Sequence, residues 1–209
     1  KLCGKGVVPI GEATGLGDIK QALVKDTFKT VNKQGTVEQR DVRTAWIEHA
    51  LSFVDAARLQ PFHLAIDAGN GMAGIVLDAL EAATPFKIEK MFAELDGTFP
   101  NHPANPTLPE GLKDLVAKVR DEHLDLGIAF DGDGDRAVLV DDKARPVNPG
   151  ILGAILIENY LGEHPGAAVV YDARASHIMP DTITKLGGRG VRSKVGHSNI
   201  KALMHEHKA

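Results

Sequence analysis

The chain has 209 residues, of which 43% are hydrophobic and 25% charged, and its formal net charge is −4. This composition is ordinary for a globular protein of one to two domains. No basic patch stands out, so we expect no nucleic-acid partner. The longest apolar runs fall short of the roughly 20 residues of a membrane span, so we expect no membrane insertion. The single cysteine, Cys3, excludes an internal disulfide framework, and it fits a reducing, cytoplasmic location.

The first part of the chain predicts two helices joined by a polar segment. Residues 16–24 predict a short helix, and residues 29–40 predict a hairpin or a linker. Residues 44–58 predict a longer helix because their apolar side chains recur at helical spacing. These side chains belong to Trp46, Ile47, Ala50, Leu51, Val54 and Ala57. We expect Trp46 to lie in the core.

Strands and helices then alternate. The predicted strands are residues 62–67, 87–92, 124–130 and 137–140. A helix is predicted at 72–83, and a second one opens at Thr107-Leu108-Pro109-Glu110, which has the spacing of a capping box. A loop rich in proline and asparagine, residues 96–106, precedes it. The strand at 124–130 is almost continuously apolar, as expected for a strand covered on both faces.

Residues 146–150 contain two prolines and a glycine, and this predicts a domain boundary. A second cycle of elements follows it. The predicted helices are residues 151–160, 177–186 and 198–205, and the predicted strands are residues 167–171 and 190–194. Such alternation implies an α/β fold with helices on the faces of the sheets.

The segment between the strands at 124–130 and 137–140 carries the strongest chemical signal. Asp131, Asp133 and Asp135 alternate with glycines, and Arg136 follows at once. Three carboxylates this close repel one another unless a cation compensates them. Mg²⁺ takes oxygen ligands and commonly keeps a position for a phosphate, and the planar guanidinium of an arginine suits a phosphate oxygen. The motif therefore predicts a Mg²⁺ site whose remaining ligand is a phosphoryl group.

Other interpretations of the same residues stay open. Asp and Gly between two strands are typical of a plain hairpin turn. A calcium loop also begins with alternating acidic residues, although Arg136 stands where that loop needs Gly and Asp142 where it prefers Glu. A phosphatase of the haloacid dehalogenase type would use Asp131 as its nucleophile. The lysine and acidic pair that such a phosphatase also needs have no match here.

Several segments resemble the phosphohexomutase family, the phosphomannomutases and phosphoglucomutases. The aspartate motif resembles the metal-binding loop of that family, and residues 67–74 resemble the opening of its second domain. Residues 96–103 resemble its bacterial mannose/glucose branch, whereas residues 171–176 and 195–201 resemble third-domain segments. The resemblance implies repeated mixed α/β/α domains, truncated at both ends. Residues 1–43 would end the first domain, 44–146 would form the second, and 147–209 an incomplete third.

The resemblance also implies an activity. Such enzymes are Mg²⁺-dependent isomerases of carbohydrate metabolism that transfer a phosphoryl group between C1 and C6 of mannose or glucose phosphates. A phosphoserine in a Thr-Ala-Ser-His-Asn-Pro-like segment mediates the transfer, and the chain contains no such segment. We therefore expect the serine to lie outside this chain, and the chain alone to show no turnover.

The family pattern assigns roles to individual residues. It assigns Mg²⁺ to Asp131, Asp133 and Asp135, and catalysis to Arg136. It assigns hexose-phosphate contacts to Arg174, Ser176, Gly196, His197, Ser198 and Lys201. Taken without the resemblance, residues 196–198 also fit a helix start where Ser198 is the N-cap and His197 lies on the surface.

Overall fold

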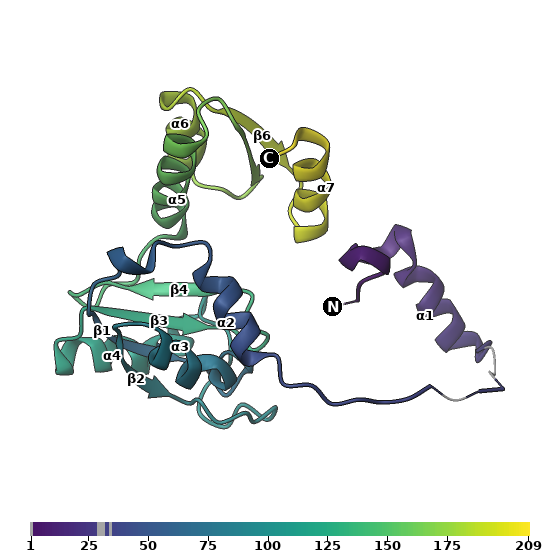
Figure 1. Ribbon diagram of the computed structural model, residues 1–209, viewed down its shortest axis with the longest axis horizontal. Helices are drawn as coiled ribbons and strands as arrows, with labels where there is room; N and C mark the ends of the chain where they lie inside the picture. Colours follow the sequence, from purple (N-terminus) through teal and green to yellow (C-terminus); the bar gives the residue numbers. More distant parts are fainter. Residues whose placement is uncertain (1, 29–31, 34) are drawn as a thin grey trace. The chain divides into compact units, whose positions relative to one another are not determined.

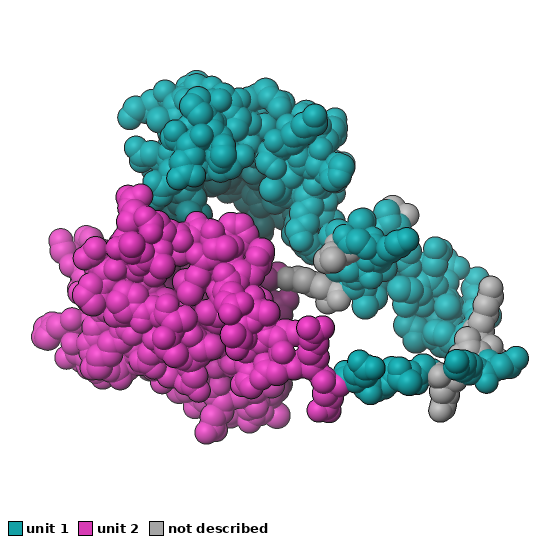
Figure 2. All heavy atoms as spheres, viewed as in Figure 1, with its two compact units in different colours: residues 1–38, 150–209 teal, residues 39–149 magenta. Residues whose placement is uncertain are grey.

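The computed structural model describes residues 2–28, 32–33 and 35–209 (Figure 1). The chain divides into two compact units, residues 39–149 and residues 1–38 with 150–209, coloured magenta and teal in Figure 2. Part of the predicted hairpin or linker at 29–40, residues 29–31 and 34, lies outside the described residues. Residues 35–42 form neither helix nor strand.

Residues 39–149 are built on one four-stranded sheet. Its strands are β1 (His63–Asp67), β2 (Lys87–Met91), β3 (Leu126–Phe130) and β4 (Ala137–Val140), in the order β2-β1-β3-β4. β1 runs parallel to β2 and β3, whereas β3 and β4 are antiparallel (Figure 1). In the β1–β3 register Asp67 lies beside Ala129. The segments that follow β1 and β3 therefore leave the sheet at the same edge.

Helices cover both faces of this sheet. Successive side chains along each strand point to opposite faces of the sheet, so each face has its own core. On one face α4 (Lys113–Glu122) packs over a cluster of Ala65, Leu112, Leu115, Val119, Leu124, Ala129 and Val140. The other face contacts the 3₁₀ turn η4 (Met72–Val76) and α3 (Leu77–Ala83). Its cluster contains Leu64, Ile66, Ala68, Ala73, Leu77 and Ile88.

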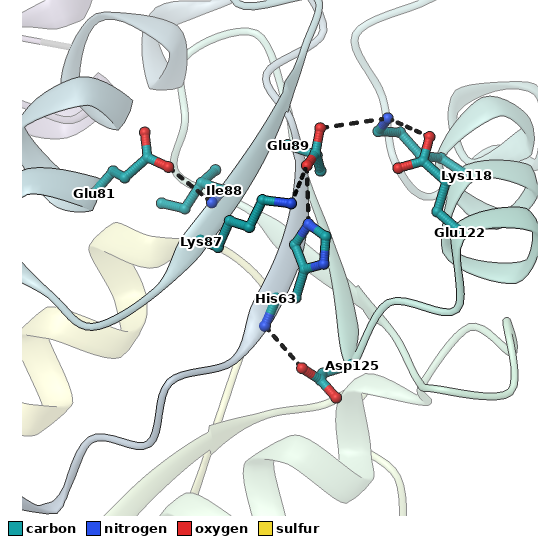
Figure 3. A network of polar contacts seen from close by, with 8 residues as sticks. All are labelled: His63, Glu81, Lys87, Ile88, Glu89, Lys118, Glu122 and Asp125. Atoms are coloured by element: carbon teal, nitrogen blue, oxygen red, sulfur yellow. Dashed lines mark hydrogen bonds and ion pairs between the residues drawn. The ribbon is translucent and has the colours of Figure 1, made fainter.

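A network of polar side chains ties the start of β1 to its neighbours (Figure 3). Glu89 on β2 pairs with His63 Nε2 at 2.9 Å, with Lys87 Nζ at 3.3 Å and with Lys118 Nζ of α4 at 3.8 Å. The backbone N–H of His63 donates to the Asp125 carboxylate, just before β3, at 2.7 Å. Partly exposed ion pairs of this kind contribute little free energy each. Their consequence is positional, because they join β1, β2, β3 and α4 at one end.

Residues 150–209 contain a second, smaller sheet. β5 (Ala168–Asp172) and β6 (Arg189–Ser193) run parallel, and Asp172 pairs with Ser193 at their carboxyl ends. Helices α5 (Pro149–Glu163) and α6 (Ile178–Lys185) enclose a small core with this sheet. Its buried residues are Ile157, Leu161 and Ile183. A third helix, α7 (His197–His207), contacts both strands.

The first residues of the chain form short helical segments. Two 3₁₀ turns, η1 (Lys5–Val7) and η2 (Glu12–Thr14), precede α1 (Leu16–Lys25). The helix predicted at 16–24 is thus confirmed. None of the helices in the described ranges combines the length and the apolar character needed to cross a membrane.

The predicted α/β class is confirmed, but the helix predicted at 44–58 is too long. The helix α2 (Arg43–Leu51) stops after nine residues. The Ser52 hydroxyl donates to the carbonyl of His49, and the Asp55 carboxylate accepts the N–H of Ala57 to begin a separate 3₁₀ turn, η3 (Ala56–Arg58). Short polar side chains thus compete with the helix for its backbone groups. The prediction that Trp46 lies in the core is also wrong, because 52% of Trp46 is exposed.

The capping box predicted at 107–110 does not form. The Thr107 hydroxyl donates to Asn105 Oδ1 at 2.8 Å instead of capping a helix. A 3₁₀ turn, η5 (Pro109–Gly111), follows, and α4 begins only at Lys113. The predicted helix at 72–83 is likewise composite, because its first turns are the 3₁₀ turn η4.

The packing of α4 on β3 predicts an intolerant glycine. A Cβ at Gly127 would lie 2.8 Å from Val119 Cγ2 and 3.0 Å from Leu115 Cδ1. Gly127→Val should therefore lower the free energy of unfolding by about 1–3 kcal/mol, measured by urea denaturation, because it overpacks a buried contact. Gly97→Val is the matched control, since a Cβ there meets nothing within 4 Å. An unchanged stability of Gly127→Val would contradict this packing.

Candidate active site

The loop 131–136 connects the antiparallel strands β3 and β4, so it is a hairpin loop as well as the aspartate motif. The N–H of Asp131 donates to the carbonyl of Arg136 at 3.2 Å, and the N–H of Arg136 donates to Asp131 Oδ1 at 3.0 Å. The N–H of Gly134 donates to the Asp131 carbonyl at 3.0 Å, and Gly134 has φ +70°, which glycine adopts without strain. The Asp131 side chain thus closes the base of its own loop.

The three aspartates converge. One carboxylate oxygen from each of Asp131, Asp133 and Asp135 lies within 4.8 Å of the other two. Oxygen ligands that surround one hard divalent cation lie at comparable separations, about 3–5 Å from one another. Among the described residues this is the one group of three or more His, Cys, Asp or Glu side chains that could hold a metal ion. Asp131 is buried, whereas Asp133 and Asp135 are exposed.

Arg136 lies against the buried member of this trio. Its Nε donates to Asp131 Oδ2 at 2.8 Å, and its Nη1 donates to Asn105 Oδ1 at 3.3 Å. Burial alone would raise the pKa of Asp131, but the hydrogen bonds and charge of Arg136 outweigh burial and hold that pKa below its ordinary value. A carboxylate has about four lone-pair sites, so Asp131 can accept from Arg136 and still ligate a cation.

Two connecting segments, one after β1 and one after β2, hold the aspartate loop in place. The N–H of Gly132 donates to the carbonyl of Ala104 at 3.2 Å, and the N–H of Met72 donates to the carbonyl of Gly132 at 3.1 Å. Gly71 approaches so closely that a Cβ there would lie 2.7 Å from the Gly132 carbonyl oxygen. The turn after β1 and the loop at 96–106 therefore fix the backbone of the aspartate loop from two sides.

The loop at 96–106 is itself anchored at the end of β1. His102 Nε2 lies 3.1 Å from Oδ2 of Asp67, and both side chains are buried. Asp67 also accepts the N–H of Gly69 at 2.8 Å. Burial raises the pKa of Asp67, and its contacts with Gly69 and His102 offset part of that rise. No spacing pattern marks a contact between residues so far apart in the chain, so the sequence predicts no role at the site for Asp67 or His102.

In residues 150–209, six candidate residues lie at the carboxyl ends of β5 and β6. Arg174 and Ser176 follow β5, and the N–H and Nη2 of Arg174 donate to the Asp172 carboxylate at 2.8 and 3.1 Å. Residues 196–198 and Lys201 follow β6, and His197 opens α7. Because β5 and β6 are parallel neighbours, both groups leave the same edge of the sheet. The metal-loop residues belong to the other unit, 39–149.

Ser198 is not the N-cap of α7. The helix begins at His197 after Gly196, whose φ of +119° is unusual for any other residue, and the Gly196 carbonyl accepts from the N–H groups of Asn199 and Ile200. Ser198 therefore lies within the first turn, which corrects the alternative interpretation of this segment. His197, Ser198 and Lys201 are all exposed on that turn and the next.

The sequence matches two domains of one protein family. "Phosphoglucomutase/phosphomannomutase, alpha/beta/alpha domain II" matches residues 44–144, and the corresponding domain III matches residues 148–209. The chain belongs to the phosphoglucomutase/phosphomannomutase family. The family resemblance seen in the sequence is thereby confirmed, together with the fold class.

Individual members of the phosphoglucomutase/phosphomannomutase family are similar over nearly the whole chain. A phosphomannomutase of Salmonella typhimurium is 38% identical over 211 residues, which cover 98% of this chain and 46% of that protein. A phosphoglucomutase of Neisseria gonorrhoeae is 34% identical, over 93% of this chain and 43% of its own. The crystal structure of a Burkholderia thailandensis family protein is 32% identical with a TM-score of 0.85, over 95% of this chain and 42% of that one. The chain thus spans about half the length of the curated relatives it matches.

The contact between Asp131 and Arg136 predicts a pH-dependent effect on stability. In the metal-free chain, Asp131→Asn should lower the free energy of unfolding at neutral pH by about 1.5–3 kcal/mol, because Arg136 loses a charged acceptor. The pKa of Asp131 is below its ordinary 3.8 in the folded chain. The contribution of the carboxylate is therefore fully present above that value and is lost as the pH falls through the folded pKa.

Urea denaturation in EDTA at a series of pH values measures this effect. The difference between wild type and variant should stay constant from about pH 7 to about pH 5 and shrink below about pH 4. Asp142→Asn, on an exposed residue beyond β4, is the control and should change stability by less than about 0.5 kcal/mol. A difference that grows on acidification would contradict the assigned contact.

Proposed function

We propose that the chain supplies the metal site and the sugar-phosphate contacts of a phosphohexomutase, which transfers a phosphoryl group reversibly between C1 and C6 of mannose or glucose phosphates. The observation that carries the proposal is the convergence of Asp131, Asp133 and Asp135 beside Arg136, in a chain of this family. In this proposal residues 1–43 end the first domain, 44–146 form the second, and 147–209 belong to the third.

The donor set of the aspartate loop fits Mg²⁺. Three carboxylate oxygens are the hard ligands that this ion prefers, and it commonly completes its coordination with water and phosphate oxygens. When bound, Mg²⁺ would neutralise charge on the transferring phosphoryl group. The role of this chain is to hold the three carboxylates in place and to aim Arg136 at a phosphoryl oxygen. A guanidinium can bind such an oxygen through parallel N–H donors.

The candidate residues of the smaller sheet suit the phosphate of a hexose phosphate. The first turn of α7 presents backbone N–H groups and the positive end of the helix dipole, which favour an anion, and Lys201 adds a charge one turn further on. Arg174 is oriented by Asp172 while 73% of its side chain stays exposed. The proposal places the sugar phosphate against Arg174, Ser176, Gly196, His197, Ser198 and Lys201. The phosphoserine lies outside this sequence, so the chain alone should not turn over substrate.

The geometry speaks against the two rival site types. In a calcium loop Asp142 would reach back to the ion, but β4 pairs along β3 and carries Asp142 to the far end of the hairpin. In a haloacid dehalogenase-type phosphatase Asp131 would attack phosphorus. Both oxygens of Asp131 instead accept from Arg136, and only 3% of the side chain is exposed. Asp131 is placed to hold a cation rather than to act as a nucleophile.

Metal binding tests the proposal directly. The 209-residue chain should bind Mn²⁺, used as a paramagnetic substitute for Mg²⁺, with Mg²⁺ as competitor. Asp133→Asn should weaken that binding by about tenfold or more, since the site loses one of three charged ligands. Electron paramagnetic resonance of free Mn²⁺ measures the affinity.

Asp142→Asn is the matched control, because it removes the same charge from the same hairpin. It should leave Mn²⁺ affinity unchanged, whereas it would abolish binding to a calcium loop. Loss of binding in Asp142→Asn, or a preference for Ca²⁺ over Mg²⁺, would contradict the proposal. So would conversion of glucose 1-phosphate by the purified chain alone, or a trapped aspartyl-phosphate.

A further inference from the structure

We propose that Asn105 is a positioning residue for Arg136, which it holds in the orientation that receives a phosphate oxygen. The inference deepens the proposed function and rests on the phosphate-binding role of Arg136. Asn105 lies in the loop between β2 and α4, 31 positions before Arg136 in the chain. The aspartate motif therefore acts together with a residue outside it.

The guanidinium of Arg136 is held from two directions. Its Nε donates to Asp131 Oδ2 at 2.8 Å, and its Nη1 donates to Asn105 Oδ1 at 3.3 Å. Contacts at two different nitrogens of a planar group fix the orientation of its plane as well as its position. The side chain remains 53% exposed, so part of the guanidinium can still meet a ligand. Without Asn105 the guanidinium would keep its hydrogen bond to Asp131 and a longer ion-pair contact with Asp135 Oδ1 at 3.9 Å, both at Nε, so it could turn about that nitrogen.

Asn105 is itself fixed by its neighbours. Its Oδ1 also accepts from the N–H of Thr107 at 3.2 Å and from the Thr107 hydroxyl at 2.8 Å. Its own N–H donates to the carbonyl of Pro103 at 2.7 Å. Gly111 packs against its backbone so closely that a Cβ there would lie 2.4 Å from the Asn105 carbonyl oxygen. The acceptor of the Arg136 hydrogen bond, Asn105 Oδ1, is therefore fixed in position.

The loop that carries Asn105 is anchored to the end of β1 and to the aspartate loop. His102 contacts the buried Asp67 at 3.1 Å, and the amide of Asn101 donates to Asn70 Oδ1 at 2.8 Å. The carbonyl of Ala104, immediately before Asn105, accepts the N–H of Gly132. The end of β1 thus sets the position of Asn105, and Asn105 sets that of Arg136 without requiring a bound metal.

This arrangement has a measurable benefit for phosphate binding. An arginine side chain has many rotamers, and ordering one at the moment of binding weakens affinity by about 2- to 10-fold. Asn105 orders the Arg136 side chain before a ligand binds, so little further conformational entropy is lost on binding. Removing the acceptor should lower phosphate affinity without altering the metal site, because no metal-ligand oxygen comes from Asn105.

The test compares Asn105→Leu, which keeps the approximate shape without the acceptor, with Asn105→Asp, which keeps an acceptor oxygen. The full 209-residue chain is labelled with ¹⁵N-arginine and saturated with Mg²⁺. The Nε–Hε signal of Arg136, assigned by its loss in Arg136→Lys, reports side-chain order by its heteronuclear Overhauser effect. Its shift on titration with inorganic phosphate reports affinity. Thr98→Val is the control, because the Thr98 hydroxyl donates to Asp96 Oδ1 in the same loop at 2.7 Å and contacts neither Asn105 nor Arg136.

In Asn105→Leu the order of Arg136 should fall and phosphate affinity should weaken by about 2- to 10-fold, with Mn²⁺ affinity unchanged. Asn105→Asp should restore the order of Arg136, and Thr98→Val should resemble wild type. Unchanged order and affinity in Asn105→Leu would overturn the inference. So would an equal loss in Thr98→Val, which would indicate general loosening of the loop. A wild-type chain with an ordered Arg136 that fails to bind phosphate would instead overturn the proposed function.

Discussion

Mutual repulsion among three carboxylates is the constraint around which residues 39–149 are arranged. Asp131, Asp133 and Asp135 present oxygens within 4.8 Å of one another on one hairpin loop. A chain holds such a group together only if opposing interactions exceed the repulsion and the cost of desolvation. Arg136 compensates the buried Asp131, and backbone hydrogen bonds from two neighbouring segments keep the loop from spreading. A divalent cation completes that compensation in the proposed function.

The parallel strands decide which distant residues meet at the site. β1 and β3 end at the same sheet edge, so the turn after β1 lies against the aspartate loop after β3. The same rule places Arg174 and residues 196–198 at one edge of the β5–β6 sheet. Ligand contacts in open α/β sheets generally gather at the carboxyl ends of parallel strands. The candidate residues come from loops or from the first two turns of α7, while the sheets set their positions.

The sequence predicted those parts of the structure that depend on local pattern. The strand predicted at 137–140 has the same bounds as the observed β4, and the aspartates converge as their alternation with glycine suggested. The longer helix at 44–58 failed where Ser52 and Asp55 bond to the backbone, because apolar spacing takes no account of such side chains. The capping box at Thr107 failed for a related reason, since the N–H and the hydroxyl of Thr107 both donate to Asn105 Oδ1 and Leu108 stands at the N-cap of the next turn.

The support of the site could not be read from spacing at all. Asp67 and His102 are 35 positions apart, and Asn105 and Arg136 are 31 apart, so only the fold brings each pair together. In the sequence Asp67 belongs to an ordinary strand-to-helix turn, and His102 and Asn105 belong to a loop rich in proline and asparagine. Their part in holding the loop appears only when the paired strand ends are seen side by side.

The most direct test of this account is the dependence of the unfolding free energy on Mg²⁺ concentration at constant ionic strength. A ligand that binds only the folded chain adds about 1.4 kcal/mol for each tenfold rise in its concentration above the dissociation constant. We expect this increase in the wild-type chain and a flat response in the double variant Asp133→Asn, Asp135→Asn. A wild-type response as flat as that of the variant would contradict the claim that a divalent cation holds the three carboxylates together.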